Sequence, residues 1–465
     1  MSLQDELIID TTYLDPILQR LTVQEKKEYQ EKVVKAARAV DELRKTGKGP
    51  DGSDVLFPHL PYLLEEHRLI SEEEKKRLLN LKEEAKNYDV VISIGIGGSY
   101  LGNQVLFDLF CGTSWNKKTK SERGGYPQIY FAGQNVDPVR LERLADTVRR
   151  EAGKVWWKMK VLLLVISKSG TTIEPMSAMK SLQNLLKDCC EVQVMAITDK
   201  EKGILRKRST ENQYPCFTVP DGIGGRFSVF SQVGLVFAQL AGIDIQSFLN
   251  GAKLVEESCQ SDDLAKNLAL RLASLKYLAT KKDGIATEII MPYGELLRTT
   301  GWWYCQLLGE SLGKKYDIHG NEVYYGRTPV PAVGTTDMHS LTQEHQQGRR
   351  NKVVQFISIA HLPNDVEVPC EEGNVSGMVP MSQMLRFAMK ANAQALASEG
   401  RLSCTITMKE LTPFHVGALL YFFFLCIAYE AAMANINAYD QPGVEAYKKI
   451  LHEDLRRYLV EHTDK

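Results

Sequence analysis

The first ~55 residues of the chain have a helical pattern of apolar and polar positions. Val23 to Arg44 is rich in Glu, Lys, Ala and Leu, and the segment GKGPDG (47–52) then interrupts the pattern. Ser71 to Lys86 is a charged amphipathic stretch with leucines at helical spacing, and its charges indicate a solvated face. We therefore expect helices in both stretches.

Short apolar runs, several of them rich in Val and Ile, follow in two series. Strands that are apolar on both faces and separated by helical or loop-like stretches indicate parallel sheets covered by helices. The first series is Val90–Ile94, Gln128–Ala132, Val161–Ile166, Val192–Ile197 and Cys216–Val219. The second series is Ala286–Met291, Val330–Val333, Val353–Ile357 and Cys404–Met408, with helices that include Thr300–Leu312 and Pro413–Asn437.

The two series predict an α/β protein with two α/β domains that divide near residues 242–250. We expect an N-terminal helical segment at 1–55, the first α/β domain at 56–245, the second at 246–437, and a C-terminal helical segment at 438–465. Val416 to Tyr429 is the most apolar segment, closed by His415 and Glu430. It is too short for an ordinary membrane span and is typical of a buried helix.

Charge and cysteine content narrow the class of protein. The 465 residues carry 57 Lys and Arg against 58 Asp and Glu, a net charge of −1. This balance gives no reason to expect nucleic acid or an anionic membrane as a partner, although it leaves room for a local basic pocket. Nine cysteines without a CxxC pair indicate reduced thiols. Because the acidic start MSLQDELIID has no signal-peptide pattern, we expect a cytoplasmic protein.

Two segments that follow strands could bind an anion. SIGIGGSYLG (93–102) is a glycine turn that should open a helix, but it lacks the GxGxxG and P-loop patterns, so it indicates either an anion or sugar site or a structural turn. ISKSGTTIEP (166–175) places four hydroxyls, one ammonium and one glycine at the end of a strand. Such a group of donors is typical of a phosphate cradle, and a helix-capping loop is the alternative.

Four further segments contain candidate chemistry. Arg226 lies in the glycine-rich DGIGGRFSVFS (221–231), where close backbone approach could present it to an oxyanion. Glu310 in GESLGKK (309–315) could act as a base. His339 and His345 in TTDMHSLTQEHQQGRR (335–350) lack the spacing of a helical zinc site. Lys448 follows the proline-glycine turn of YDQPGVEAYKK (439–449).

Together these segments resemble the phosphoglucose isomerase family in its bacterial form. DGIGGRFS (221–228) and YDQPGVEAYK (439–448) are similar to the best-known signatures of the family, and GIGGS, SKSGTT, GESLGK and TTDMHS occur in the expected order over roughly residues 60 to 450. The resemblance implies two sugar-isomerase (SIS) domains in tandem. It also implies interconversion of glucose 6-phosphate and fructose 6-phosphate, in glycolysis and gluconeogenesis, with no metal or cofactor.

The resemblance assigns roles to individual residues. Glu310 matches the proton-transfer base, Arg226 the arginine that stabilises the enediol, His339 the ring-opening histidine, and Lys448 the lysine near the ring oxygen. The implied substrate-binding residues are Gly98, Ser99, Ser167, Lys168, Ser169, Thr172, Glu174 and Gln441, with Glu174 orienting the histidine. The family is usually a homodimer in which the histidine is donated across the interface, so we expect a homodimer.

Two other interpretations differ in function. A non-catalytic sugar-phosphate sensor of the same domain type would need neither Glu310 nor Lys448. A dual glucose/mannose 6-phosphate isomerase would keep the same residues and is harder to exclude. The isomerase half of an amidotransferase is disfavoured, because no cysteine-nucleophile domain precedes the sugar domains.

Overall fold

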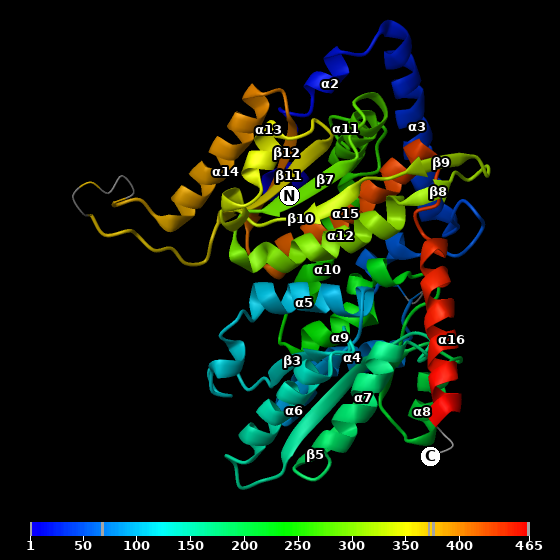
Figure 1. The fold of residues 1–465 in the computed structure, drawn as a ribbon, viewed down its shortest axis with the longest axis vertical. Helices are drawn as coiled ribbons and strands as arrows, with labels where there is room; N and C mark the ends of the chain where they lie inside the picture. The colour runs from blue at the N-terminus through cyan, green and yellow to red at the C-terminus, as the bar shows by residue number, and fades with distance from the viewer. Residues whose placement is uncertain (1, 67–68, 371–372, 374–376, 463–465) are drawn as a thin grey trace.

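The computed structural model describes residues 2–66, 69–370, 373 and 377–462. A parallel sheet and a mainly parallel sheet lie one above the other, with helices around and between them (Figure 1). Three short elements precede the first long helix: α1 (Leu3–Glu6), β1 (Leu7–Asp10) and α2 (Pro16–Gln19). The arrangement confirms the expected mixed α/β fold.

The first sheet has five parallel strands in the order β3-β2-β4-β5-β6. Its strands are β2 (Val90–Ile94), β3 (Gln128–Ala132), β4 (Met159–Ile166), β5 (Cys190–Thr198) and β6 (Cys216–Thr218). The helices of this half are α4 (Glu72–Glu84), α5 (Gly98–Phe110), α6 (Pro138–Ala152), α7 (Ile173–Leu186), α8 (Ile204–Glu211) and α9 (Gln232–Leu240). All five expected strands are confirmed, two of them with their predicted bounds.

The second sheet has the order β1-β12-β11-β7-β10, and only β1 is antiparallel to its neighbour. Its other strands are β7 (Thr287–Pro292), β10 (Thr328–Pro331), β11 (Lys352–His361) and β12 (Leu402–Glu410), and β8 (Lys314–Tyr316) and β9 (Glu322–Tyr325) form a separate antiparallel pair. The helices are α10 (Ile245–Ser258), α11 (Leu268–Lys282), α12 (Arg298–Leu312), α13 (Thr342–Gln347), α14 (Met381–Ser398), α15 (Pro413–Ala434) and α16 (Glu445–His462).

The remaining helical segments are short 3₁₀ helices, and two of them contain candidate site residues: η4 contains Arg226 and η6 contains His339. They are η1 (Phe57–Tyr62), η2 (Ala85–Asn87), η3 (Trp115–Lys117), η4 (Gly225–Phe230), η5 (Glu295–Leu297), η6 (Thr336–His339) and η7 (Pro442–Val444).

The N-terminal segment is not purely helical, which corrects the sequence expectation for residues 1–55. β1 pairs antiparallel with β12, Leu7 opposite Met408, and so places the start of the chain at the edge of the second sheet. Helix α3 (Val23–Thr46) does form as predicted. It begins with a capping box between Thr22 and Glu25 and ends at Gly47 in the left-handed conformation.

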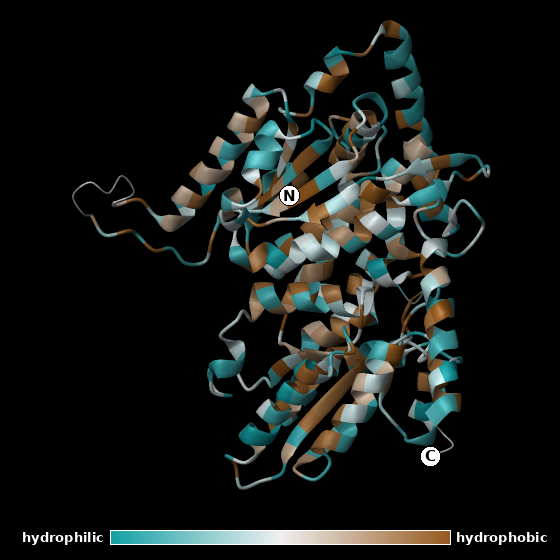
Figure 2. Ribbon diagram, in the orientation of Figure 1, coloured by the Kyte–Doolittle hydropathy of each residue, from teal (hydrophilic) through white to brown (hydrophobic). Residues whose placement is uncertain are grey.

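Helix α15 confirms the expected buried helix. It is long and apolar enough to cross a membrane, but 94% of its most apolar window is buried among the other helices, so it is a core helix. Gly251 of α10 and Gly417 of α15 allow the two helices to meet, because a Cβ on Gly251 would lie 1.8 Å from the Phe414 carbonyl oxygen. Apolar residues concentrate on the strands and inner helices, whereas the surface helices are mixed (Figure 2).

A buried network of charges holds α15 against the second sheet. The guanidinium of Arg327 donates from Nε to Glu288 Oε2 (2.8 Å) and from Nη2 to Glu430 Oε2 (2.7 Å), and Lys276 Nζ lies 2.5 Å from Glu288 Oε1. Burial alone would raise the pKa of Glu288, but Lys276 and Arg327 lower it to about 2. Each charge is therefore compensated inside the core.

We predict that Arg327→Met destabilises the protein by about 3–5 kcal/mol, because Glu430 loses its buried cation. Denaturant unfolding at neutral pH measures the change, with Lys45→Met as the matched control. Lys45 pairs with Asp41 on the exposed face of α3, and a pair of that kind contributes about 0–1 kcal/mol. Equal unfolding midpoints for the two variants would contradict the prediction.

Candidate active site

Arg226 is the most deeply buried charged group of the candidate site. Its Nε donates to Ser311 Oγ (2.7 Å) and its Nη1 to Gln441 Oε1 (2.6 Å), while Nη2 reaches the carbonyls of Ala438 and Asp440. Burial lowers the pKa of Arg226 from its ordinary value, and the charges of Glu310 and Asp440 oppose that shift. The side chain is therefore fixed by acceptors from α12 and from the segment before η7.

Glu310 lies in the last turn of α12, next to this guanidinium. Its Oε2 is 3.4 Å from Arg226 Nη1, and its Oε1 accepts a hydrogen bond from Gln306 Nε2 (3.1 Å). The side chain is 32% exposed, whereas that of Arg226 is 1% exposed. The carboxylate is thus oriented by two donors and keeps an open side through which a small molecule could approach.

The glycine turn GIGGS lies against the backbone next to Arg226 and against Gln306, the hydrogen-bond partner of Glu310. A Cβ on Gly98 would sit 1.9 Å from the Gly225 carbonyl oxygen, and one on Gly97 would sit 2.9 Å from Gln306 Nε2. Only glycine allows this approach, and Gly97 also has a positive φ of 57°. The start of α5, with Ser99 in its first turn, is therefore adjacent to the loop of Arg226 and to α12.

The SKSGTT loop connects the carboxyl end of β4 to the start of α7. Ser167 is buried, its Oγ accepts from the Gly170 amide (3.1 Å), and it shares a hydrogen bond with Thr172 Oγ1 (3.4 Å). Ser169 Oγ accepts from the Thr171 amide (3.2 Å). Thr172 is the N-cap residue of α7, yet its side chain makes no capping hydrogen bond, so the alternative of a simple capping loop does not account for this hydroxyl.

Lys168 joins this loop to the loop that holds Arg226. Its Nζ donates to Asp221 Oδ1 (3.2 Å), the first residue of DGIGGRF. Both loops, together with the GIGGS turn, follow strands of the first sheet at their carboxyl ends. This is the edge at which open α/β sheets bind ligands.

Lys314 and Gln306 belong to this cluster and were not identified from the sequence. Lys314 is buried, and its Nζ donates to the carbonyls of Glu310 (2.9 Å) and Asp440 (2.6 Å) and lies 2.9 Å from Asp440 Oδ1. Burial lowers its pKa. Nothing in the sequence distinguishes Lys314 from its exposed neighbour Lys315, whereas Gln306 could have been found as the residue one helical turn before Glu310.

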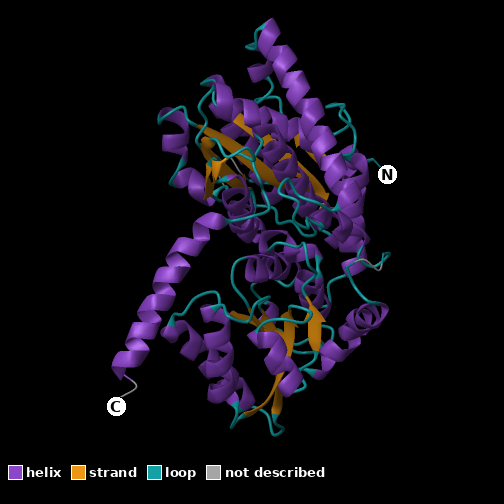
Figure 3. Cartoon of the chain, turned by 90° about the vertical axis from the view of Figure 1, so that its right-hand side faces the viewer, coloured by secondary structure: helices purple, strands orange, loops and turns teal. Residues whose placement is uncertain are grey.

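Three of the expected site residues do not join the cluster. His339 is exposed on η6, Glu174 lies in the first turn of α7, and Lys448 pairs with Glu445 (2.8 Å) on α16. No hydrogen bond or ion pair between described residues connects any of them to Glu310 or to Arg226, and none connects Glu174 to His339. Helix α16 leaves the body of the molecule as a separate rod and buries none of its side chains (Figure 3).

A search for metal ligands over the described ranges gives no cluster of three or more His, Cys, Asp or Glu side chains. The chemistry that this cluster offers is that of a carboxylate beside a fixed cation, with hydroxyl and amide donors at a neighbouring loop.

Known proteins that are similar to this chain in sequence carry the same description. The family model for phosphoglucose isomerase matches residues 80–462. A glucose-6-phosphate isomerase of Carboxydothermus hydrogenoformans is 34% identical over 92% of this chain and 89% of its own, and one of Symbiobacterium thermophilum is 35% identical over 78% and 79%.

Solved structures agree on the fold. A hypothetical protein from Thermus thermophilus superposes with a TM-score of 0.80 at 26% identity, covering 97% of this chain and 99% of its own. A glucose-6-phosphate isomerase from Chlamydia trachomatis superposes with a TM-score of 0.76 at 23% identity, covering 94% and 87%. The family match over residues 80–462 and the two isomerases that are 34% and 35% identical show that the chain belongs to the phosphoglucose isomerase family.

Proposed function

We propose that the protein interconverts glucose 6-phosphate and fructose 6-phosphate through a cis-enediol intermediate. The observation that carries this proposal is the pairing of Glu310 with the buried Arg226, beside a loop rich in hydrogen-bond donors for a phosphate. Coupled turnover of fructose 6-phosphate tests it directly. Parallel turnover of mannose 6-phosphate distinguishes a dual isomerase, and a sensor of the same fold would turn over neither sugar.

Glu310 is the proposed base that moves a proton between C2 and C1. One carboxylate can remove the proton from one carbon and return it to its neighbour on the same face, so a single base is sufficient. Negative charge develops on the oxygens of the enediol. The guanidinium of Arg226, fixed in position by Ser311 and Gln441, can offset that charge without reorganising.

The SKSGTT loop is the proposed site for the substrate phosphate. Ser167, Lys168, Ser169 and Thr172 supply hydroxyls and an ammonium at the helix start, where backbone amides and the helix dipole also favour an anion. Binding the phosphate away from the reacting carbons would hold the sugar in register with Glu310. Gly98, Ser99 and Gln441 would line the sugar between these two points.

His339 and Lys448 are the proposed ring-opening groups, and Glu174 would orient the histidine. Because His339 is exposed and makes no described contact with the Glu310 cluster, we propose that it acts at the site of a second copy in a homodimer. Lys448 lies only seven residues after Gln441, on the exposed α16, and would complete the site on substrate binding. We place the protein in the cytoplasm.

We predict that Glu310→Gln lowers kcat by at least about 10³-fold while sugar-phosphate binding is largely kept. The substitution preserves size and the Gln306 hydrogen-bond acceptor but removes the base, whose contribution is typically about 10²–10⁴-fold. Glu322→Gln on the exposed β9 is the matched control and should leave kcat unchanged. Turnover of Glu310→Gln within about tenfold of the parent would exclude Glu310 as the sole base.

We predict that Ser167→Ala with Thr172→Ala raises KM for fructose 6-phosphate. Each hydrogen bond lost to a charged phosphate costs about 1.5–3 kcal/mol. Steady-state kinetics measure the change, with Thr147→Ala on the exposed face of α6 as control. If the double variant kept the KM and kcat/KM of the parent, the proposal that this loop binds the substrate phosphate would be contradicted.

We predict that inactive His339→Ala and Glu310→Gln subunits restore activity when they form a mixed dimer. If the histidine is donated across the interface, one site of each mixed dimer combines an intact Glu310 with the His339 of the other subunit. If both residues act within one chain, both sites remain defective. Activity of the purified mixed dimer, obtained by co-expression with two different tags, distinguishes the two arrangements, and an inactive mixed dimer contradicts donation.

A further inference from the structure

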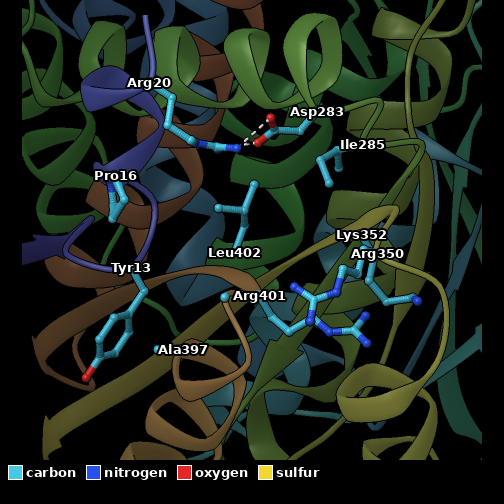
Figure 4. A pocket seen from close by; sticks show the side chains of 11 residues that line it. Tyr13, Pro16, Arg20, Asp283, Ile285, Arg350, Lys352, Ala397, Arg401 and Leu402 are labelled. Carbon is cyan, nitrogen blue, oxygen red and sulfur yellow. Dashed lines mark hydrogen bonds and ion pairs between the residues drawn. The ribbon is translucent and has the colours of Figure 1, made fainter.

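A cavity of about 470 Å³ lies away from the candidate active site and shares no residue with it. One wall comes from the N-terminal segment with Tyr13, Pro16 and Arg20, and the other from the amino ends of β11 and β12 (Figure 4). This volume is in the range of sites that hold small organic ligands, roughly 300–1,000 Å³.

The lining of this cavity carries an excess of positive charge. Arg20 forms a two-pronged ion pair with Asp283, Nη1 to Oδ1 at 3.0 Å and Nη2 to Oδ2 at 2.5 Å. Across from this pair, the side chains of Arg350, Lys352 and Arg401 gather on one side of the cavity (Figure 4). Asp283 is the only carboxylate among the described lining residues.

Arg401 is the residue in this group whose charge is least compensated. It is 7% exposed, and its Nη1 and Nη2 donate to the neutral carbonyls of Arg349 (2.9 Å) and Gly348 (2.7 Å). Its Nε has no hydrogen-bond partner, and no carboxylate of a described residue forms an ion pair with it. A buried cation without a counter-charge is destabilising unless an anion is supplied from elsewhere.

Lys352 and Arg350, which lie beside Arg401, add further positive charge to this wall of the cavity. Lys352 Nζ donates to the same Arg349 carbonyl (2.6 Å), so one oxygen holds an ammonium and a guanidinium close together. Among the carboxylates that the structure describes, only the half-exposed Glu344 (2.9 Å) forms an ion pair with the ammonium. Arg350 lies 3.8 Å from Glu399 and packs over Gly400, where an added Cβ would be 3.5 Å from its Nη1.

We propose that this cavity is a second ligand site, specific for a small organic phosphomonoester. Planar guanidinium groups match the geometry of phosphate oxygens and bind them through paired hydrogen bonds. Tyr13, Ile285 and Leu402 supply apolar surface for the organic part of the ligand. A bound phosphate would connect the N-terminal segment to β11 and β12, and it would stabilise the folded protein by an amount that rises with the logarithm of the ligand concentration above the dissociation constant.

Phenyl phosphate is the probe, because it combines one phosphate with a flat apolar body. Binding is measured by calorimetry and thermal shift on the full chain carrying Ser167→Ala and Thr172→Ala, so that the proposed phosphate loop of the active site is weakened. In that background Arg350→Met is compared with Arg143→Met, an exposed arginine of α6. Arg350 is 64% exposed at its side chain, so its replacement should not impair folding.

We expect Arg350→Met to weaken phenyl phosphate binding by about tenfold or more, the loss of one hydrogen bond to a charged group, and Arg143→Met to leave it unchanged. Phenol, which lacks the phosphate, should not bind. Equal affinity for the two variants, or no stabilisation by phenyl phosphate in this background, would overturn the proposal. Because turnover of fructose 6-phosphate is assayed separately, failure here leaves the proposed reaction untouched.

Discussion

The buried guanidinium of Arg226 is the constraint around which the candidate site is built. Taking this charge out of water requires that its donors find acceptors, and it obtains them from segments far apart in the chain: Ser311 and Glu310 on α12, and Gln441 with two carbonyls before η7. The loop after the first sheet, a helix of the second half and the C-terminal segment therefore meet at one point. The acceptors that replace water around the Arg226 guanidinium are therefore the same contacts that bring the parts of the site together.

Helix α12 can serve this purpose because it is held at two points along its length. At its middle, Tyr304 donates to Glu288 (2.7 Å), which belongs to the buried network of Arg327, Lys276 and Glu430. Near its end, Glu310 and Ser311 contact Arg226. The network also connects β7 to α15, the core helix. Buried charges that would each be destabilising without a partner thus fix the position and orientation of α12, the helix that carries Glu310.

Sequence patterns predicted the elements whose signal is local. Val90–Ile94 and Gln128–Ala132 are mostly apolar runs, and their bounds agree with β2 and β3. β1 was missed because Leu7–Asp10 is short, and its strand character depends on pairing with Met408 at the other end of the chain. The β8 and β9 pair was missed because the two strands are only three and four residues long. Lys314 was missed for a related reason, since its burial depends on Asp440.

Motif order placed His339, Lys448 and Glu174 in one site, but one chain does not bring them to Glu310. The order of motifs along the sequence does not predict which copy of the chain supplies a side chain to a site. It also does not predict where α16 lies relative to the rest of the chain. The groups proposed to hold charge and phosphate are assembled by contacts within one chain. Arg226, for example, donates both to Ser311 on α12 and to Gln441 before η7. The proposed ring-opening groups are on the exposed η6 and α16. Proton transfer between carbons needs a rigid base and a fixed cation, whereas opening the ring needs donors that act on a substrate already bound. The groups proposed for proton transfer between carbons are fixed by contacts within one chain, whereas those proposed for ring opening make no described contact with them, and this difference follows the division between the two chemical steps.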